Sequence, residues 1–534
     1  MDKNIVVNQQ FENSNIKTLL NEVMEKTINP EDYYEIAAIL ESLGWNDSSA
    51  SKSFGVLDIF ELSKILWDMI NNKAYLQPFM EEKKTSVRSN MVLIIKSFLR
   101  GLIFALPMTI SVISMLTLRF SLWSYENSST ELATSIAIGT ILSFVTIGGF
   151  TQVIARRGFY YISQDFYNMA KRITYYFVRV GYVTTFAVAL ILILFNSFFG
   201  YLPYRMIIVA SFYYIFLCSN WLIITITYIL KREFTFTALL SFGILIVFIL
   251  FKILKLNIIV SQIISLFIIS ILSFILINYF FNKDEKKMEK GIAPALPRKS
   301  VMIYSLAPYF YYGFLYFSFL FIDRVIAWST TGDYMPYIIW FRGDYELGLD
   351  FALLMLLIPM GMVEVTVSRL MEKLEVAQKN SFNDQGTIIN KKYLNFYIRN
   401  VILVSISAIL SSIFVFLIVR YLNNDSSLLT NSKFVFNNVT YFVFIVGLIA
   451  YSILSVALSN VVILFSLSQP KLVTKAMAYS VLINFFVGFL LSRWFHYYFA
   501  ALGLLIGAVF FCIATCYCVV KVLNNLDYYL YASS

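Results

Sequence analysis

Charged residues gather where two predicted membrane helices reach the outer side of the bilayer. Asp323 and Arg324 lie near the outer end of the seventh helix, and Glu346 and Asp350 lie near the outer end of the eighth. Glu346 and Asp350 are one helical turn apart, so both project from the same face. A charge inside a bilayer costs about 2.5 kcal/mol or more, and such residues persist where they pair or face water. We therefore expect either a salt-bridge group, in which Arg324 holds Asp350 and clamps the two helices, or a hydrated mouth for an ion or a polar substrate.

Two more charged residues lie inside predicted membrane helices. Glu364, towards the inner end of the eighth helix, has apolar neighbours, and a lone carboxylate in that setting suits proton exchange. Its alternative role is an ion pair with Arg369. Arg179 lies at the inner side of the third helix, where its long side chain can extend to the membrane interface. Arg179 and Arg324 are the cations predicted to contact an anionic sugar or a lipid phosphate. The carboxylates predicted for proton or sodium coupling are Glu364, Glu346 and Asp350.

The elements that must position these residues are long apolar segments. Hydrophobic residues make up 59% of the 534 residues and charged residues 14%, whereas a soluble protein would carry about a quarter charged residues. About 20 helical residues cross the roughly 30 Å hydrocarbon core. We predict an all-α polytopic membrane protein with twelve spans, at 98–120, 132–155, 175–199, 206–230, 235–254, 258–281, 302–327, 347–369, 398–421, 439–466, 473–493 and 498–522.

Lysines and arginines are concentrated in alternate connecting loops. Loops rich in these residues stay in the cytoplasm, so the alternation places both termini inside and Thr331 and Asn431 outside. The most charged connection, 282–300, contains Lys286 and two prolines and is predicted to be a cytoplasmic linker. It divides the spans into two six-helix bundles, at 93–281 and 301–534. Weak similarity between these halves suggests a parallel repeat, an arrangement that transporters use.

Residues 1–92 differ in composition from the rest of the chain. Glu31–Leu43 and Val56–Ile70 have apolar residues at helical spacing, and Asp58 lies where a helix should begin. Gly44–Ser53 between them is predicted to be a loop. These helices are too short to cross a bilayer, so we predict a small helical cytoplasmic domain.

Several classes of function lack their usual residues. Most of the formal charge of +10 lies in the inner loops, where orientation and contact with anionic lipids explain it, so nucleic acid is not an expected partner. The four cysteines have no histidine or carboxylate companions at metal spacing, and we predict no metal or other cofactor. The sequence has no Gly-rich phosphate loop and no His-Glu-x-x-His motif. A protein that is not an enzyme is therefore the leading interpretation. An integral-membrane glycosyltransferase or polymerase is the alternative.

The stretch Tyr304–Trp328, followed by Tyr345–Asp350, resembles the exopolysaccharide exporters of the PelG type, within the wider MATE and Wzx-like flippase superfamily. The residues in common are an aromatic helix that ends in Ile-Asp-Arg-x-Ile-x-Trp and the acidic start of the next helix. The six-plus-six layout agrees with this resemblance over residues 95–523. The resemblance implies two six-helix bundles around a central cavity, alternating access, and export of a polysaccharide or a lipid-linked sugar.

These features predict a multi-pass flippase of the plasma membrane whose partners are membrane lipids and a polysaccharide or lipid-linked sugar. The N-terminal domain is expected to contact cytoplasmic synthesis machinery. Two further alternatives are an exporter of small toxic cations and a scaffold whose helices only anchor the N-terminal domain. A central cavity between residues 98–281 and 302–522 would distinguish a transporter from a scaffold.

Overall fold

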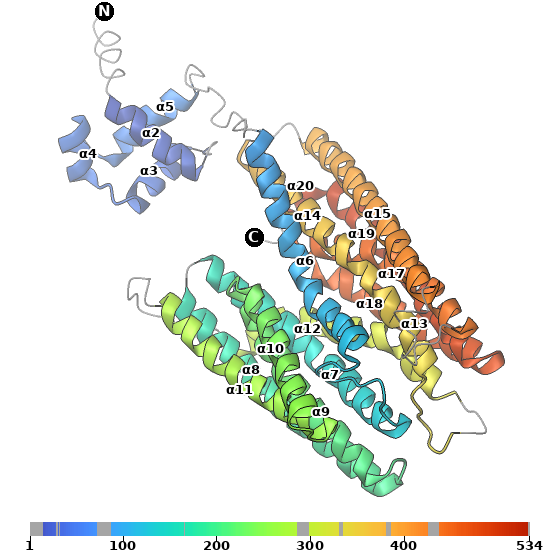
Figure 1. The fold of residues 1–534 in the computed structure, drawn as a ribbon. Coiled ribbons are helices and arrows are strands. Elements are labelled where there is room, and N and C mark those ends of the chain that lie inside the picture. Colours follow the sequence, from blue (N-terminus) through green and yellow to red (C-terminus); the bar gives the residue numbers. More distant parts are fainter. Residues whose placement is uncertain are drawn as a thin grey trace, which may run out of the picture. The chain divides into compact units, whose positions relative to one another are not determined.

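The computed structural model describes a chain built from helices (Figure 1). Close contacts along the backbone divide the chain into two units: Met1–Ile94 with Arg369–Tyr393, and Ile95–Ser368 with Leu394–Ser534. The described residues are 14–27, 30, 32–71, 87–164, 166–285, 298–330, 335–380, 386–424 and 437–531.

Eleven helical segments among the described residues are long and apolar enough to cross a membrane, and each covers a predicted span. This agreement confirms the all-α polytopic class. The segments are α7 (Thr130–Ser163), α8 (Tyr167–Phe199), α9 (Tyr204–Ile229), α10 with a π-helical end η1 (Glu233–Phe248, Ile249–Ile253), α11 (Ile258–Glu285), α12 (Lys299–Trp328), α13 with η2 and α14 (Gly343–Leu353, Leu354–Leu356, Leu357–Asn380), α15 (Gly386–Asn424), α17 (Asn438–Ser466), α18 (Pro470–Trp494), and η4 with α19 (Tyr497–Phe499, Ala500–Asn524). A short helix, α20 (Leu526–Tyr531), follows.

The first predicted span, 98–120, overlaps α6 (Val87–Leu118), a helix of 32 residues that ends two residues earlier than predicted. Several side chains of α6 lie outside the described residues, and α6 is not counted among the eleven segments. The topology markers Lys286, Thr331 and Asn431 also lie outside the described residues. The sidedness of the chain therefore stays a prediction.

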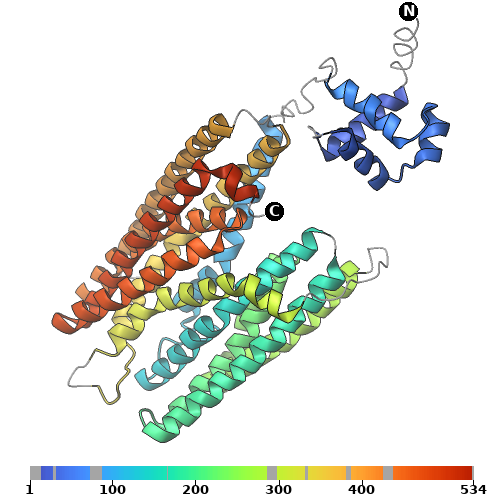
Figure 2. The ribbon, with the colours of Figure 1, turned by 180° about the vertical axis from the view of Figure 1, so that it is seen from behind.

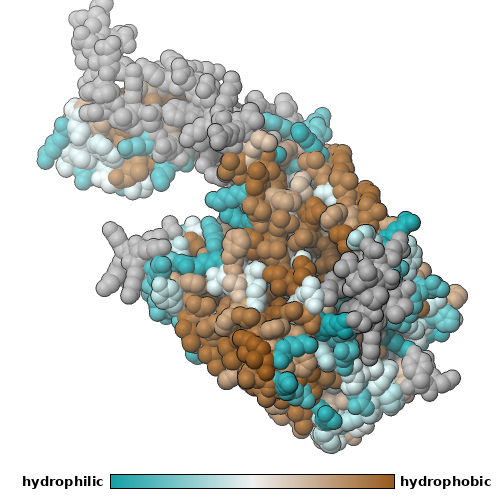
Figure 3. Space-filling view, in the orientation of Figure 1, coloured by the Kyte–Doolittle hydropathy of each residue, from teal (hydrophilic) through white to brown (hydrophobic). Residues whose placement is uncertain are grey.

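The surface of the membrane unit agrees with lipid contact. The sides of its helices are largely hydrophobic in the face shown in Figure 3. On α8, Phe186 and Leu190 are each 58% exposed, and on α15 Leu410 is 61% exposed. Apolar rows of this size on a water-soluble protein would promote association, whereas in a bilayer they contact acyl chains.

The eighth span is interrupted near its middle. Pro359 has no N–H group, so it cannot donate to the carbonyl of Met355 four residues earlier. The short 3₁₀ segment η2 lies at this point, and the hydroxyl of Ser411 on α15 donates to the Met355 carbonyl at 2.6 Å. Backbone groups freed by proline inside membranes are satisfied by neighbouring helices in this way. The interruption separates the segment α13, which carries Glu346 and Asp350, from the segment α14.

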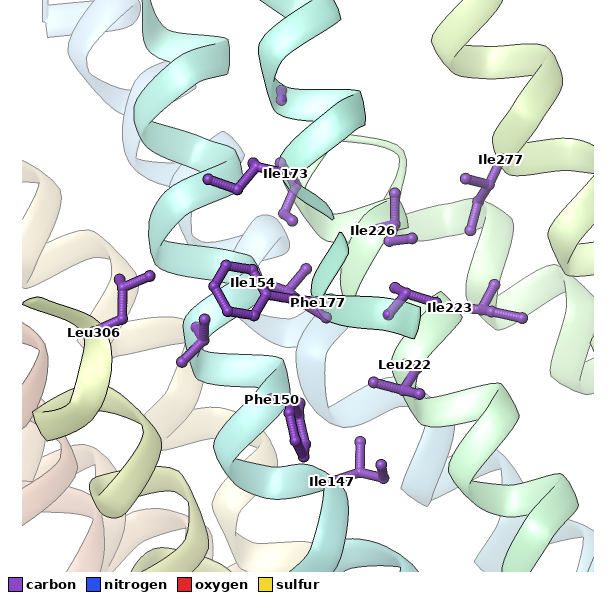
Figure 4. Packing of buried hydrophobic residues seen from close by; sticks show 14 of the residues in the cluster. Ile147, Phe150, Ile154, Ile173, Phe177, Leu222, Ile223, Ile226, Ile277 and Leu306 are labelled. Carbon is purple, nitrogen blue, oxygen red and sulfur yellow. The ribbon is translucent and has the colours of Figure 1, made fainter. Parts of the chain in front are cut away.

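Helix α12 begins the second half of the chain, yet its N-terminal part packs into the core of the first half. Met302, Leu306 and Tyr309 belong to a buried cluster whose other members come from α7, α8, α9 and α11, as Figure 4 shows for Leu306. Nearer its C-terminal end, the ring centroid of Phe319 lies 6.5 Å from that of Phe511 on α19. Helix α12 therefore contacts both bundles, and Figure 2 shows it passing between them.

Two close glycine contacts join the halves of the membrane unit. A Cβ added at Gly313 of α12 would lie 2.2 Å from the carbonyl oxygen of Gly148 on α7. A Cβ added at Gly101 of α6 would lie 2.8 Å from Cα of Gly361 on α14. Glycine permits this close approach because it has no side chain. In each half, the first helix thus touches the second span of the other half, a symmetry that agrees with the predicted repeat.

The N-terminal helices have a small hydrophobic core of their own. Helices α2 (Ser14–Lys26), α3 (Tyr33–Ser42), α4 (Asp47–Phe54) and α5 (Ile59–Asn71) share a buried cluster that includes Leu40, Leu62 and Leu66. Helices α3 and α5 correspond to the two predicted helices. Asp58 caps α5 as predicted, since its carboxylate accepts a hydrogen bond from the N–H of Glu61 at 2.7 Å.

The predicted loop Gly44–Ser53 is wrong, because α4 occupies most of it. The side chain of Asn46 accepts from the N–H of Ser49, and the Ser49 hydroxyl in turn accepts from the N–H of Asn46, which forms a capping box. Gly55 ends the helix with φ of +69°. This helix is short and polar, so apolar periodicity does not reveal it, whereas its capping residues would have.

Candidate functional site

Asp323 and Arg324 are consecutive residues near the C-terminal end of α12. Successive side chains of a helix point about 100° apart, so the two residues face different neighbours. Both are buried, with 0% of Asp323 and 6% of Arg324 exposed. Charged groups buried to this extent need partners.

Arg324 forms ion pairs with two carboxylates of α13. Its Nη1 donates to Oε2 of Glu346, and both Nη1 and Nη2 lie 3.1 Å from Oδ1 of Asp350. Helix α13 presents both carboxylates on one face because they are one turn apart. Glu346 is buried, whereas 49% of the Asp350 side chain is exposed. One carboxylate of the site, that of Glu346, is therefore buried, and the other, that of Asp350, reaches the surface.

Asp323 has a different partner. The hydroxyl of Tyr345 donates to its Oδ2 at 2.7 Å, and both side chains are fully buried. The sequence predicts Asp323 as part of the ion-paired group, but its described contact is this hydrogen bond. Asp323, Arg324, Glu346 and Asp350 still lie together, and they comprise three carboxylates and one guanidinium.

Two aromatic donors complete the group. Nε1 of Trp328 donates a hydrogen bond to Oε1 of Glu346 at 2.9 Å, and the hydroxyl of Tyr345 donates one to Asp323. The buried carboxylates are thus each held by an aromatic side chain. Trp328 and Tyr345 are not among the site residues predicted from the sequence, although their spacing indicates them. Trp328 lies one turn after Arg324, and Tyr345 precedes Glu346.

Two arginines bind the C-terminal end of α12, next to the ion pairs. Arg493 of α18 donates to the carbonyl of Ser329 at 3.0 Å and to the hydroxyl of Thr330. Arg342 donates to the carbonyl of Thr330 at 2.8 Å and stacks over the ring of Tyr497. Cations stabilise a helix C-terminus because its carbonyls carry partial negative charge. Burial lowers the pKa of the Arg342 guanidinium from its ordinary value.

The other two predicted site residues lie elsewhere. Oε1 of Glu364 on α14 lies 4.0 Å from Nη1 of Arg100 on α6, and its side chain is 29% exposed. The partner of Glu364 is therefore Arg100 from the other half of the chain, where the sequence suggests Arg369. Arg179 lies exposed on α8. The structure does not bring Glu364 or Arg179 to the Arg324 group.

Half-buried aromatic rings extend from the Arg324 group into the first bundle. Arg324 lies over the ring of Phe321 at 5.5 Å. The ring of Phe144 on α7 stacks against Phe321 and Phe317 with centroid distances of 5.4 and 5.3 Å. Trp221 of α9 lies 4.5 Å from Phe144. Rings from both halves of the chain therefore adjoin the charged group.

The fold and the site define a polytopic membrane protein with two helical bundles and a charged group near the C-terminal end of their shared helix α12. Searches found no matching family model and no matching curated protein. Similarity appears only at the level of structure.

Three solved MATE transporters illustrate this similarity. The eukaryotic MATE transporter AtDTX14 superposes with a TM-score of 0.54 at 10% identity, over 83% of this chain and 99% of its own. VcmN of Vibrio cholerae in its bent form gives 0.54 at 12% identity, over 83% and 99% of the two chains. A MATE protein in the straight conformation gives 0.54 at 11% identity, over 82% and 96%. The chain therefore has the fold of the MATE transporters, and identities this low establish the fold alone.

Proposed function

We propose that the protein is a membrane transporter of the flippase type, which exports a polysaccharide or a lipid-linked sugar by alternating access. The MATE fold supports transport as the class of function. The observation that favours this proposal most is the Arg324 group. A salt bridge that only holds α12 and α13 together would not need a carboxylate that is exposed to solvent. Half of the Asp350 side chain is exposed beside a buried, doubly paired guanidinium, which suits contact with a polar solute.

The aromatic rings beside this group support a sugar as the solute. Binding sites for small organic molecules combine apolar and aromatic walls with a few placed polar groups. Phe144, Phe317 and Phe321 supply the rings, and Arg324 and Asp350 supply hydrogen-bonding groups to hydroxyls or to an anionic sugar. Arg179 on the first bundle is a second candidate cation for the same solute.

The contacts between the halves support alternating access. Gly313 against Gly148 and Gly101 against Gly361 are close backbone contacts, with the rings of Phe317 and Phe98 packed beside Gly148 and Gly361. Packed helices can change their contacts through small sliding or tilting, as in shear motions. The central cavity that alternating access requires is part of the proposal.

Export needs a source of free energy, and we propose an ion gradient or coupling to polymer synthesis. Glu346 and Asp350 are the carboxylates proposed to exchange protons or sodium at the outer side. Glu364, which is partly exposed and only 4.0 Å from Arg100, is the candidate nearer the inner side. The partial exposure of Asp350 and Glu364 gives water or ions access to both.

The proposed location is the plasma membrane, with both termini and the N-terminal domain in the cytoplasm. From there the N-terminal domain is proposed to contact the enzymes that synthesise the polymer. Its separate core of α2 to α5 suits a docking module. The exopolysaccharide exporters of the PelG type are the family proposed for residues 95–523.

A second candidate is an exporter of organic cations. The Arg324 group contains three carboxylates and one guanidinium, so its excess of negative charge favours a positively charged solute. This observation competes directly with the sugar proposal.

A flux assay with purified protein in liposomes decides between the two. A lipid-linked oligosaccharide and the organic cation ethidium are offered in parallel, with and without a proton gradient. Movement of the oligosaccharide that is lost in Asp350→Ala supports the sugar proposal. Ethidium flux without oligosaccharide movement would refute it and favour the cation exporter. The absence of flux with both, in a correctly folded sample, would argue against transport.

A further inference from the structure

The turn that follows α9 holds a lysine where helices usually have glycine. Lys231 adopts φ of +55°. The N–H of Lys231 donates to the carbonyl of Tyr228, and that of Arg232 donates to the carbonyl of Thr227. This is the pattern of a helix that ends through a left-handed residue, a position at which glycine is preferred because other residues are strained there.

The second half of the chain contains the same turn after α17. Ser468 adopts φ of +57°, and the N–H of Gln469 donates to the carbonyl of Leu464, as Arg232 does to Thr227. The side chains have different surroundings. The hydroxyl of Ser468 accepts a hydrogen bond from Nη2 of Arg156 on α7 at 3.2 Å. Ser468 thus joins the two halves, whereas Lys231 is exposed and lines a pocket.

This pocket has a volume of about 530 Å³ and lies in the first bundle, between the ends of α7 and α9, the start of α8 and the end of α11. Its lining is part apolar and part polar: Ile162, Ser163, Tyr167, Leu230, Lys231, Arg232 and Asp284. The predicted topology places it at the inner surface of the membrane, where headgroups and cytoplasmic solutes are both in reach.

Arg232 at the pocket and Lys171 beside it are both paired with carboxylates of α11. Nη2 of Arg232 lies 3.1 Å from both carboxylate oxygens of Asp284, which neutralises this arginine. At the next position on α11, Glu285 pairs with Lys171 at 3.4 Å. Among the described residues that line the pocket, Lys231 is then the cation without a carboxylate partner, and it adds one positive charge to a pocket with two hydroxyl side chains.

We propose that this pocket binds a phosphate group at the inner face of the first bundle, carried by an anionic lipid headgroup or by a soluble phosphate. The ammonium of Lys231 pairs with the phosphate, Tyr167 offers a hydroxyl donor, and Ile162 and Leu230 cover the apolar part of a lipid ligand. The strained backbone of Lys231 fits this assignment, because strain persists where a side chain has a role at that position. The site is independent of the transported solute.

The test compares Lys231 and Ser468, two turn residues that have the same left-handed backbone conformation but differ in charge. Lys231→Gly removes the ammonium and relieves the left-handed strain, so this variant should be at least as stable as the parent chain. Ser468→Gly relieves the matching strain without removing a charge, and Lys231→Arg retains the charge. Full-length protein in phosphatidylcholine nanodiscs is titrated with short-chain phosphatidylglycerol, and separately with inorganic pyrophosphate.

We expect Lys231→Gly to weaken the binding of phosphatidylglycerol about fivefold, the effect of removing one cation near a headgroup. Ser468→Gly and Lys231→Arg should bind as the parent chain does. If pyrophosphate displaces the lipid, the natural ligand class is a soluble phosphate, and if it does not, the ligand is a headgroup. Equal binding by Lys231→Gly and the parent chain, or an equal loss in Ser468→Gly, would overturn the proposal.

Discussion

Both terminal nitrogens of Arg324 lie 3.1 Å from the same oxygen of Asp350, while Nη1 also donates to Glu346. One guanidinium is thus shared between a buried carboxylate and an exposed one. The two carboxylates should respond differently to substitution because water can compensate the charge of Asp350 and cannot compensate that of Glu346.

Replacement of Arg324 by alanine should destabilise the protein strongly. The substitution leaves the Glu346 carboxylate buried without its cation, and removal of one partner of a buried ion pair costs about 3–5 kcal/mol. Thermal unfolding of purified protein in detergent measures the effect. Arg205→Ala is the matched control, because Arg205 is exposed near the start of α9 and its loss should change little. Similar unfolding temperatures for the two variants would show that the Arg324 group does not stabilise the fold.

Neutralisation of the two carboxylates should separate stability from transport. Glu346→Gln should lower stability more than Asp350→Asn, since Glu346 is buried and receives hydrogen bonds from Arg324 and Trp328. Asp350→Asn should fold normally and reduce flux. A double-mutant cycle of Arg324→Ala with Asp350→Ala should give a coupling energy of about 0.5–3 kcal/mol, as for residues in contact. Strict additivity would contradict the ion pair.

The hydroxyl of Ser411 should stabilise the protein only when residue 359 is proline. Ser411→Ala leaves the buried carbonyl of Met355 without its 2.6 Å hydrogen bond, at a cost of about 1–3 kcal/mol. Pro359→Ala restores an N–H that can donate to this carbonyl within the helix. We therefore expect Ser411→Ala to cost less in the Pro359→Ala background, as measured by thermal unfolding. The same cost in both backgrounds would be inconsistent with the proposed compensation.

The contact between Gly313 and Gly148 should tolerate no side chain. Gly313→Ala places a Cβ 2.2 Å from a backbone oxygen, so α7 and α12 must separate. The expected result is a clear loss of monodisperse protein in size-exclusion chromatography. Gly343→Ala is the control, because its added Cβ meets only Phe341, at 3.9 Å. Gly313→Ala protein as stable as this control would mean that the helices are not in close contact.

Cysteine labelling tests the predicted sidedness. In a chain whose native cysteines Cys218, Cys512, Cys516 and Cys518 are replaced, a cysteine at Lys286 should react with an impermeant reagent only after the cells are opened. A cysteine at Asn431 should react in intact cells. Labelling of the Lys286 position in intact cells would reverse the predicted orientation.

The membrane helices could be predicted from sequence because their length and apolarity are local properties. The predicted span 258–281, for example, lies within α11 (Ile258–Glu285). Helix α4 was missed because its stability depends on the Asn46 and Ser49 caps, which apolar periodicity ignores. The interruption at η2 follows from Pro359, but its compensation by Ser411 depends on a contact between η2 and α15 that no local pattern contains.

The candidate site was predictable in part for the same reason. Glu346 and Asp350 share a face through simple helical spacing, and proximity at the outer side suggested Arg324 as their partner. The position of Arg493 could not be predicted, because it lies 164 residues from Ser329 in the chain. The pairing of Glu364 with Arg100 likewise depends on the crossing of α6 over α14.

The packing of α12 has a consequence for biogenesis. Because Met302, Leu306 and Tyr309 complete the buried cluster of the first bundle, a nascent chain that ends after α11 has an unfinished core. The first bundle must therefore wait for a helix from the second half to be synthesised and inserted. Truncation before α12 should yield a fragment that is inserted into the membrane but remains open to degradation, and co-expression of the missing half should protect it.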